Sequence, residues 1–211
     1  MKHEFIKRLI SSIILIPIVL FFVIKGLIYF NFFILICLII TLYEWYMMSK
    51  NKPYIVPGLI FIFFSFYTVY FLRNEFNEDY LYFLMILGIC IFTDIGGYFF
   101  GKIFKGPKLT KISPNKTYSG MIGGYFLSLI SLSYFMNWIN EETSINWFIV
   151  TILISSISQI GDIIISYFKR LSKIKNTGKI IPGHGGLLDR IDGMIFAFPF
   201  FYIIELIEFL N

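Results

Sequence analysis

Seven long apolar runs constrain the fold of this chain more than any other feature. They cover residues 9–24, 27–48, 54–72, 80–100, 120–138, 145–168 and 191–210. Most are close to the length of helix that crosses a hydrocarbon core of about 30 Å. A helix satisfies its own backbone hydrogen bonds, which lipid cannot do. The sequence therefore predicts an all-α fold, a polytopic integral membrane bundle of about seven transmembrane helices.

The composition excludes the main soluble classes. Hydrophobic residues make up 57% of the 211 residues and charged residues only 15%, against roughly a quarter charged in an average soluble domain. So few charges cannot cover a water-soluble domain of this size, and a disordered or collagen-like chain is excluded as well. Cys37 and Cys90 both lie in apolar runs without ligand spacing, so we predict neither a disulfide framework nor a zinc site.

The basic residues predict which connections lie in the cytoplasm. With a cytoplasmic N-terminus, 16 of the 18 Lys and Arg residues fall inside and only Lys25 and Arg73 outside, as expected for a membrane protein. The outside segments instead carry Glu75, Glu78, Asp79, Glu141 and Glu142. A signal peptide is the alternative for the basic start, but no A-x-A site follows the first run, so we predict a retained helix. The net charge of +5 then reflects topology, and no nucleic-acid partner is predicted.

Two predicted cytoplasmic segments, 101–119 and 169–190, are longer and more polar than the other connections. They contain Gly, Pro and Ser as well as Lys, and the acidic residues that are hardest to explain lie beside them. We therefore predict that residues 1–93 supply N-terminal membrane helices and that residues 94–211 form the catalytic region, within a single structural unit.

Two carboxylates lie inside apolar runs, where an unpaired charge is costly and often functional. Asp94 lies late in the fourth run; its alternative role is to cap a neighbour or pair with a loop lysine. Asp162 belongs to a stripe that recurs every three or four positions: Ser155, Ser158, Gln159, Asp162, Ser166, Lys169 and Arg170. Such a stripe faces the bundle interior or a water-filled cavity. Interhelical hydrogen bonding is the alternative for Ser155 and Ser158.

Asp189 and Asp192 lie three positions apart at the start of the last run, so they share one helix face. With Asp162, and with Asp94 as a further candidate, they could form a carboxylate cluster. Clusters of oxygen ligands prefer hard cations such as Mg²⁺, with phosphates completing the shell. The alternative is that Asp189 and Asp192 complement the N-terminal end of a helix.

Two loop segments are candidates for phosphate binding. His184 lies among Gly183, Gly185 and Gly186, and such a backbone can approach a phosphate closely. In the other loop, Ser113, Lys116 and Thr117 offer hydroxyls and an ammonium; positive-inside topology with helix capping is the alternative there. A basic mouth above carboxylates favours phosphoryl or nucleotidyl transfer at the membrane face.

These residues resemble the signature of the phosphatidate cytidylyltransferases, or CDP-diacylglycerol synthases. The resemblance runs from Ser166-Tyr-Phe-Lys169-Arg170 through Lys175-Asn176 and Gly178 to Pro182-Gly183-His184-Gly185-Gly186-Leu-Leu-Asp189-Arg190-Ile-Asp192. Asp94, Tyr98 and Gly101, with Ser113-Pro114-Asn115-Lys116-Thr117, resemble a second region of the family. The resemblance thus covers about residues 94–192, and before them only hydropathy and Glu44-Trp45. The family usually has acidic residues where this chain has Asn176 and Ser119.

The resemblance implies an activity and a site. CTP and phosphatidic acid would give CDP-diacylglycerol and pyrophosphate, with Mg²⁺ held by Asp162, Asp189 and Asp192 and a second cation such as K⁺ left open. Lys169 and Arg170 would complete the catalytic set. The implied substrate-binding residues are Asp94, Ser113, Lys116, Thr117, Ser166, Lys175, His184, Gly185, Gly186 and Arg190. A homodimer in a bacterial inner membrane is implied, with the active site on the cytoplasmic side.

Three other functions are alternatives that the sequence supports less well. A related enzyme would use CTP on another membrane lipid or phosphorylate a polyprenol. A transporter would use Asp94 and Asp162 as an ion relay, but the polar residues gather on the cytoplasmic side alone. A CDP-alcohol phosphotransferase would need a D-G-x-x-A-R arrangement, which this sequence lacks.

Overall fold

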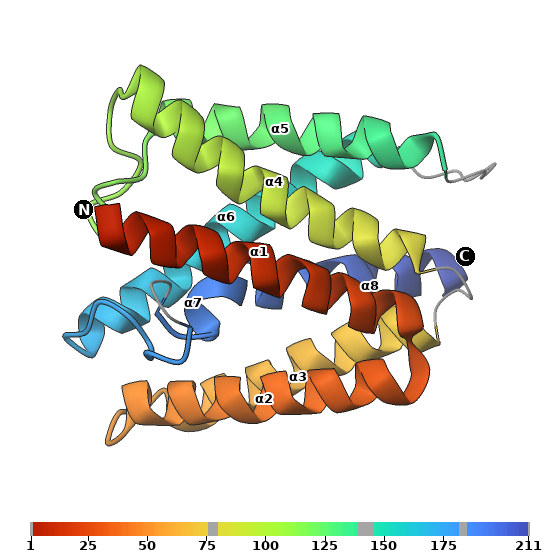
Figure 1. Cartoon of the computed structure of the whole chain (residues 1–211), viewed down its shortest axis with the longest axis horizontal. Coiled ribbons are helices and arrows are strands. Elements are labelled where there is room, and N and C mark those ends of the chain that lie inside the picture. The colour runs from red at the N-terminus through yellow and green to blue at the C-terminus, as the bar shows by residue number, and fades with distance from the viewer. Residues whose placement is uncertain (1, 76–79, 139–145, 182–184, 211) are drawn as a thin grey trace. The chain divides into compact units, whose positions relative to one another are not determined.

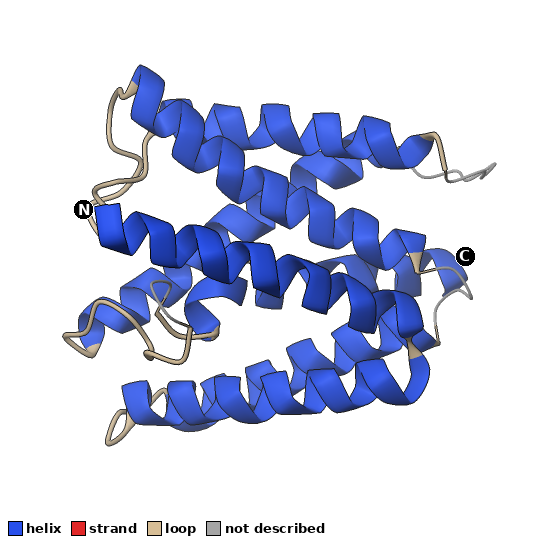
Figure 2. Cartoon of the chain, in the orientation of Figure 1, coloured by secondary structure: helices blue, strands red, loops and turns tan. Residues whose placement is uncertain are grey.

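The computed structural model describes residues 2–75, 80–138, 146–181 and 185–210, and all of the regular secondary structure in these residues is helical (Figures 1 and 2). The helices are α1 (Lys2–Lys25), α2 (Leu27–Ser49), α3 (Ile55–Asn74), α4 (Leu81–Phe104), α5 (Tyr118–Met136), α6 (Trp147–Leu171), α7 (Leu188–Ile191) and α8 (Met194–Leu210). Each predicted apolar run corresponds to one long helix, so the predicted all-α fold is confirmed.

The last predicted helix begins three residues later in the structure, and its predicted first residue belongs to a separate short helix. The prediction started one helix at residue 191, whereas the four-residue α7 ends at Ile191 and α8 begins at Met194. Between them lies Gly193, where an added Cβ would overlap the Ser158 side chain and lie 2.8 Å from the Ser158 carbonyl oxygen. The hydrophobic pattern could not show this break, because it depends on the close approach of α6.

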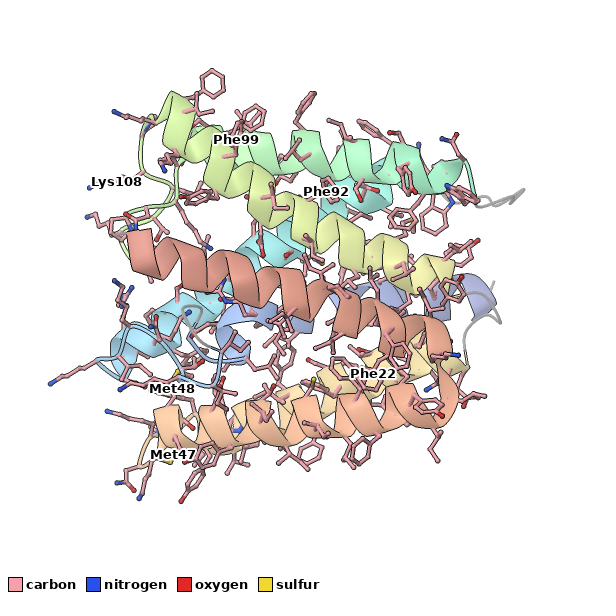
Figure 3. The ribbon with its side chains drawn as sticks, viewed as in Figure 1. Phe22, Met47, Met48, Phe92, Phe99 and Lys108 are labelled. Carbon is pink, nitrogen blue, oxygen red and sulfur yellow. The ribbon has the colours of Figure 1, made fainter. Side chains whose placement is uncertain are left out.

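Among the residues that the structure describes, five helices, α2 to α6, are long and apolar enough to cross a membrane. The apolar segments Ile14–Lys25 of α1 and Met194–Ile207 of α8 are shorter. Many large apolar side chains are exposed, among them Phe92 and Phe99 of α4, which Figure 3 labels. Exposed apolar surface on this scale is typical of helices that face lipid. The chain is a polytopic membrane protein, and the predicted count of about seven is compatible with these five spans and the two shorter apolar segments.

The chain forms two compact units. Unit 1 contains residues 1–80 and 168–192, and unit 2 contains residues 81–167 and 193–211. Helix α6 belongs to unit 2 as far as Tyr167 and to unit 1 from Phe168 onwards. The predicted functional boundary at residue 93 lies within α4, all of which belongs to unit 2. A single structural unit stays a prediction.

One end of unit 1 is organised by Arg73 near the end of α3. Its Nε donates to the Val23 carbonyl oxygen at 2.7 Å, and the guanidinium lies 5.9 Å from the centre of the Phe30 ring. Gly26 between α1 and α2 has φ 62, and a Cβ there would overlap the guanidinium. Glycine therefore allows the turn and makes room for the cation that caps α1.

The other end of unit 1 joins the α2–α3 turn to the segment after α6. Trp45 of α2 packs edge-on against Phe168, with 5.2 Å between the ring centres, and donates from Nε1 to the Ile55 carbonyl oxygen at 3.1 Å. The Tyr54 hydroxyl is 2.9 Å from Ser172 Oγ. These contacts place the start of the 172–187 loop beside the α2–α3 turn.

In unit 2, α4 and α5 pack closely through glycines. A Cβ on Gly96 would overlap the Gly123 carbonyl oxygen, and a Cβ on Gly120 would lie 2.6 Å from the Gly97 carbonyl oxygen. Small residues allow this approach between membrane helices. Thr117 caps α5 by accepting from the Gly120 N–H at 3.1 Å. The α4–α5 pair therefore fixes where the 105–117 loop ends.

Polar contacts hold α6 to α4 and α5. Thr93 donates to Ser155 Oγ at 2.8 Å, and the Tyr125 hydroxyl is 2.9 Å from Ser156 Oγ. Ser155 and Ser158 are both buried. The prediction that the polar stripe of α6 faces the bundle interior is therefore confirmed for these two serines, and Ser155 makes the interhelical hydrogen bond considered as its alternative role.

Candidate active site

Unit 1 contains a buried ion cluster that is a candidate for function. Lys169 Nζ lies 2.9 Å from Asp189 Oδ1 and 3.6 Å from Asp192 Oδ2. A single ammonium contacts both carboxylates, which confirms that Asp189 and Asp192 share a face. Burying an ion pair costs desolvation energy that pairing only roughly offsets. This cluster is therefore a poor source of stability and a good candidate for function.

The second oxygen of Asp189 is held by backbone amides. Asp189 Oδ2 accepts from the Thr177 N–H at 2.8 Å and from the Gly186 N–H at 3.0 Å. Gly186 lies two residues before the short helix α7 and Asp189 lies in its first turn, so part of the alternative helix-end role of Asp189 is present. With Lys169 on Oδ1, both carboxylate oxygens have a fixed direction.

Glu44 also belongs to this region, although the sequence predicted no site role for it and only the resemblance included it. It lies on α2 and is 1% exposed. Its Oε1 accepts from the Leu187 N–H at 2.9 Å, and its Oε2 accepts from the Leu188 N–H at 2.8 Å and from Thr177 Oγ1 at 3.0 Å. Asp94 and Asp162 are site candidates because they are acidic residues inside apolar runs. Glu44 also lies inside an apolar run, so the same criterion could have identified it.

The glycines of the signature have a structural reason in unit 1. A Cβ on Gly178 would lie 2.5 Å from Glu44 Oε1, and a Cβ on Gly186 would overlap both the Glu44 carboxylate and the Thr177 hydroxyl. Gly185 has φ 90, a backbone conformation that favours glycine. These positions leave room for Glu44 and for the turn. The predicted contact of Gly185 and Gly186 with substrate stays a prediction.

Unit 2 contains its own candidate cluster, around Asp162. Lys116 Nζ is 2.5 Å from Asp162 Oδ2, and Ser166 donates to Asp162 Oδ1 at 3.3 Å. The side chains of Lys116 and Asp162 are 22% and 29% exposed, against 9% and 5% for Lys169 and Asp189. The Asp162 pair is thus the more accessible to solutes.

The loop before α5 is ordered by local hydrogen bonds. Thr117 caps α5, and its hydroxyl is 2.9 Å from Ser119 Oγ, which also donates to the Lys105 carbonyl oxygen. The Lys116 N–H donates to the Ser113 carbonyl oxygen at 3.0 Å. The capping role considered for Thr117 is therefore present. Ser119, at a position usually acidic in the family, closes this turn instead.

The remaining predicted residues lie at the surface or outside the described residues. Arg170 is exposed and donates to the Ile174 carbonyl oxygen at 3.1 Å, just beyond α6. The other exposed residues of the predicted set are Asp94, Lys175 and Arg190. His184 lies outside the described residues, so its predicted role is not tested.

The donor chemistry fits a hard cation. Asp162, Asp189 and Asp192 offer only carboxylate oxygens, which Mg²⁺ prefers. In the residues that the structure describes, no three His, Cys, Asp or Glu side chains lie close enough to hold a metal ion. Asp162 belongs to unit 2 and the other two aspartates to unit 1, so the predicted cluster stays a prediction.

The fold and these clusters define a membrane enzyme with paired carboxylates and lysines, and comparison with known proteins gives its family. Residues 6–76 and 54–207 match the cytidylyltransferase family. A phosphatidate cytidylyltransferase of Rickettsia felis is 36% identical over an alignment of 221 positions, which covers 98% of this chain and 94% of the relative. The phosphatidate cytidylyltransferase of Rickettsia prowazekii is 36% identical over an alignment of 220 positions, which covers 97% of this chain and 93% of the relative.

A third relative is matched over a smaller part of its length. The phosphatidate cytidylyltransferase of Staphylococcus aureus (strain COL) is 36% identical over 166 residues, 74% of this chain and 62% of the relative. The chain belongs to the cytidylyltransferase family. The similarity to the Rickettsia relatives also includes the N-terminal helices, well beyond residues 94–192, which carry the resemblance in the sequence.

Proposed function

We propose that this protein is a phosphatidate cytidylyltransferase, which converts CTP and phosphatidic acid to CDP-diacylglycerol and pyrophosphate in the membrane. The observation that carries the proposal is the 36% identity to a phosphatidate cytidylyltransferase across 98% of the chain. The two carboxylate–lysine clusters support it, because transfer between two polyanions requires positioned charge more than covalent chemistry.

In the proposed reaction, a phosphate oxygen of phosphatidic acid attacks the α-phosphorus of CTP. The bond between the α-phosphorus and the bridging oxygen breaks, and pyrophosphate leaves. Asp162, Asp189 and Asp192 would hold Mg²⁺, which supplies charge neutralisation and alignment of the phosphates when bound. Lys169 and Arg170 would stabilise the phosphate charge, and a second cation such as K⁺ stays a prediction.

The other predicted residues would bind the substrates. Lys175 and Arg190 are exposed cations of the signature segment, suited to phosphate oxygens. Lys116 and Ser166 both contact Asp162. They would therefore bind the nucleotide beside this carboxylate. The remaining members of this set are Asp94, Ser113, Thr117, His184, Gly185 and Gly186.

We further propose a cytoplasmic N-terminus and active site in the inner membrane of a bacterium, and a homodimer as the resemblance implies. The distribution of basic residues supports this orientation. In unit 1, the Tyr54–Ser172 contact brings the basic α2–α3 turn to the same end as the basic 172–187 loop. In unit 2, Lys116 lies beside the cytoplasmic part of α6. The relatives named above are bacterial.

A related lipid acceptor is the second candidate. Asn176 and Ser119 are neutral where the family is usually acidic, and this difference favours a test of other lipids. An enzyme that transfers cytidylate to another lipid, or phosphate to a polyprenol, would share the same fold and nucleotide.

The decisive experiment measures pyrophosphate release by the purified protein in mixed micelles. We expect release only when CTP, phosphatidic acid and Mg²⁺ are all present, and none with a chelator. Asp162→Asn, Asp189→Asn and Asp192→Asn should each abolish nearly all activity, because they delete the ligand charge without changing the shape. Lys52→Gln, in the exposed α2–α3 turn, is the control and should keep it. Cytidylate on a different lipid, or phosphate transfer alone, would contradict the proposal.

A further inference from the structure

We propose that Glu44 is a positioning residue of the active site. It anchors the loop of residues 177–188, so that Asp189 presents one fixed oxygen to the metal cation. The inference rests on the proposed function for its catalytic consequence. Its structural premise lies wholly within unit 1, where α2, the 177–188 segment and Lys169 all belong.

Glu44 holds both ends of the loop. Thr177 lies near the start of the segment and Leu188 at its end, and both donate to Oε2, while Leu187 donates to Oε1. A buried carboxylate is costly unless hydrogen bonds satisfy it, and these three donors do so. The apolar helix α2 thus carries a carboxylate whose partners lie in a loop more than 130 positions later in the chain.

The same loop holds Asp189. Three successive amides divide between the two carboxylates: the Gly186 N–H donates to Asp189, and the next two donate to Glu44. Thr177 also bridges them, since its hydroxyl donates to Glu44 and its backbone N–H to Asp189. Any shift of the loop away from Glu44 would therefore move both donors that fix Asp189 Oδ2.

This arrangement decides which oxygen of Asp189 can act. Oδ2 is engaged by two amides, whereas Oδ1 faces the Lys169 ammonium at 2.9 Å. Oδ1 is therefore the Asp189 oxygen that would face the metal cation. Glu44 itself is 1% exposed and both of its oxygens accept hydrogen bonds, so it acts through the loop.

Packing argues that the loop is built around this carboxylate. Gly178 and Gly186 have no room for a Cβ because the Glu44 carboxylate occupies that space. Trp45, the next residue, packs against Phe168 and so ties α2 to the end of α6 that carries Lys169. Helix α2 thus positions both partners of the ion pair.

The experiment compares Glu44→Gln, Glu44→Asp and Thr177→Val with the unchanged protein. Glu44→Gln keeps the shape but turns an amide toward N–H donors. We expect kcat to fall between about tenfold and about a hundredfold, as for other residues that orient metal ligands, with KM for CTP nearly unchanged. Glu44→Asp should recover part of the loss because it restores the carboxylate. Thr177→Val, which removes only the hydroxyl bond, should lose less than Glu44→Gln.

A second measurement does not depend on activity. Hydrogen–deuterium exchange of the protein without Mg²⁺ or CTP should show faster exchange in a peptide covering residues 177–188 of Glu44→Gln. The side-chain amide of Gln has a single acceptor oxygen, so the Leu187 amide or the Leu188 amide loses its acceptor. Glu75→Gln removes an exposed carboxylate at the end of α3 and is the control. It should leave both exchange and kcat unchanged.

The outcomes separate this inference from the proposed function. If the unchanged protein releases no pyrophosphate from CTP and phosphatidic acid, the proposed function fails, and the exchange measurement still decides whether Glu44 anchors the loop. Unchanged exchange in Glu44→Gln, or unchanged kcat in an active protein, would overturn the inference. Should Glu44→Gln not fold, normal kcat and exchange in both Glu44→Asp and Thr177→Val would overturn it.

Discussion

Each carboxylate proposed to bind metal contacts a lysine of its own unit. Lys116 pairs with Asp162 in unit 2, and Lys169 contacts Asp189 and Asp192 in unit 1. The lysines neutralise carboxylates that an apolar environment would otherwise disfavour. Under the proposed function, a divalent cation would compete with these ammonium groups, which would then be available to the phosphates of the substrates.

Substitution of Asn176 tests how one added negative charge near Asp189 affects the Mg²⁺ requirement. Its Cβ and Cγ lie 3.4 Å from the position of a Cβ on Gly185, and Asp189 Oδ2 lies 2.7 Å from the same position. Asn176→Asp would therefore add a negative charge near Asp189. We expect the Mg²⁺ concentration for half-maximal activity to fall by roughly fivefold, corresponding to about 1 kcal/mol for one charged contact.

Titration of both Mg²⁺ and CTP measures this effect. Asn137→Asp, at the exposed end of α5, is the matched control and should change neither requirement. A higher CTP requirement with an unchanged Mg²⁺ requirement would instead show that position 176 contacts the nucleotide.

At the scale of the elements, the α4–α5 pair controls the geometry around Lys116. The glycines let the two backbones approach, and the Thr117 cap starts α5 directly after Lys116. The direction of Lys116 toward Asp162 therefore depends on helix packing as well as on loop sequence.

Gly96→Ala and Gly97→Ala form a matched pair on α4. A Cβ on Gly96 would overlap the Gly123 carbonyl oxygen, whereas the nearest atom to a Cβ on Gly97 is 3.9 Å away. We expect Gly96→Ala to destabilise the protein by about 1–3 kcal/mol through overpacking. Gly97→Ala should be neutral or stabilising by about 0.5–1 kcal/mol. The midpoint of unfolding in an SDS titration measures both, and equal midpoints would contradict the packing argument.

At the scale of the whole molecule, orientation in the membrane is open to direct test. We expect Asn77→Cys and Glu142→Cys to be labelled by an impermeant thiol reagent from the outside. Lys108→Cys should be labelled only after the membrane is opened, because Lys108 belongs to the basic α4–α5 connection (Figure 3). Asn77 and Glu142 lie outside the described residues, so the prediction rests on the charge distribution.

The labelling needs a background without reactive cysteine. Cys90 is buried and Cys37 half-buried, and both are replaced by alanine for the measurement. Labelling of position 77 or 142 from the cytoplasmic side alone would reverse the proposed orientation.

The sequence by itself determined the helices, the membrane class and the family. Run length and hydropathy are local properties, so they predict where a helix crosses a bilayer. The signature between Ser166 and Asp192 is likewise contiguous in sequence, which is why it identified the family before any contact was known. The residue types around Asp162, Asp189 and Asp192 were enough to predict an oxygen-ligand site.

Only the tertiary structure decided which side chains meet. Glu44 and Leu188 are 144 positions apart, and no periodicity connects them. Nor could the sequence show that Lys116 pairs with Asp162, or that Gly193 separates α7 from α8 by its approach to Ser158. The physical reason is the same in each case. A partner is chosen by which helix faces lie together, and a pattern within one helix predicts its apolar and polar faces without specifying the neighbour.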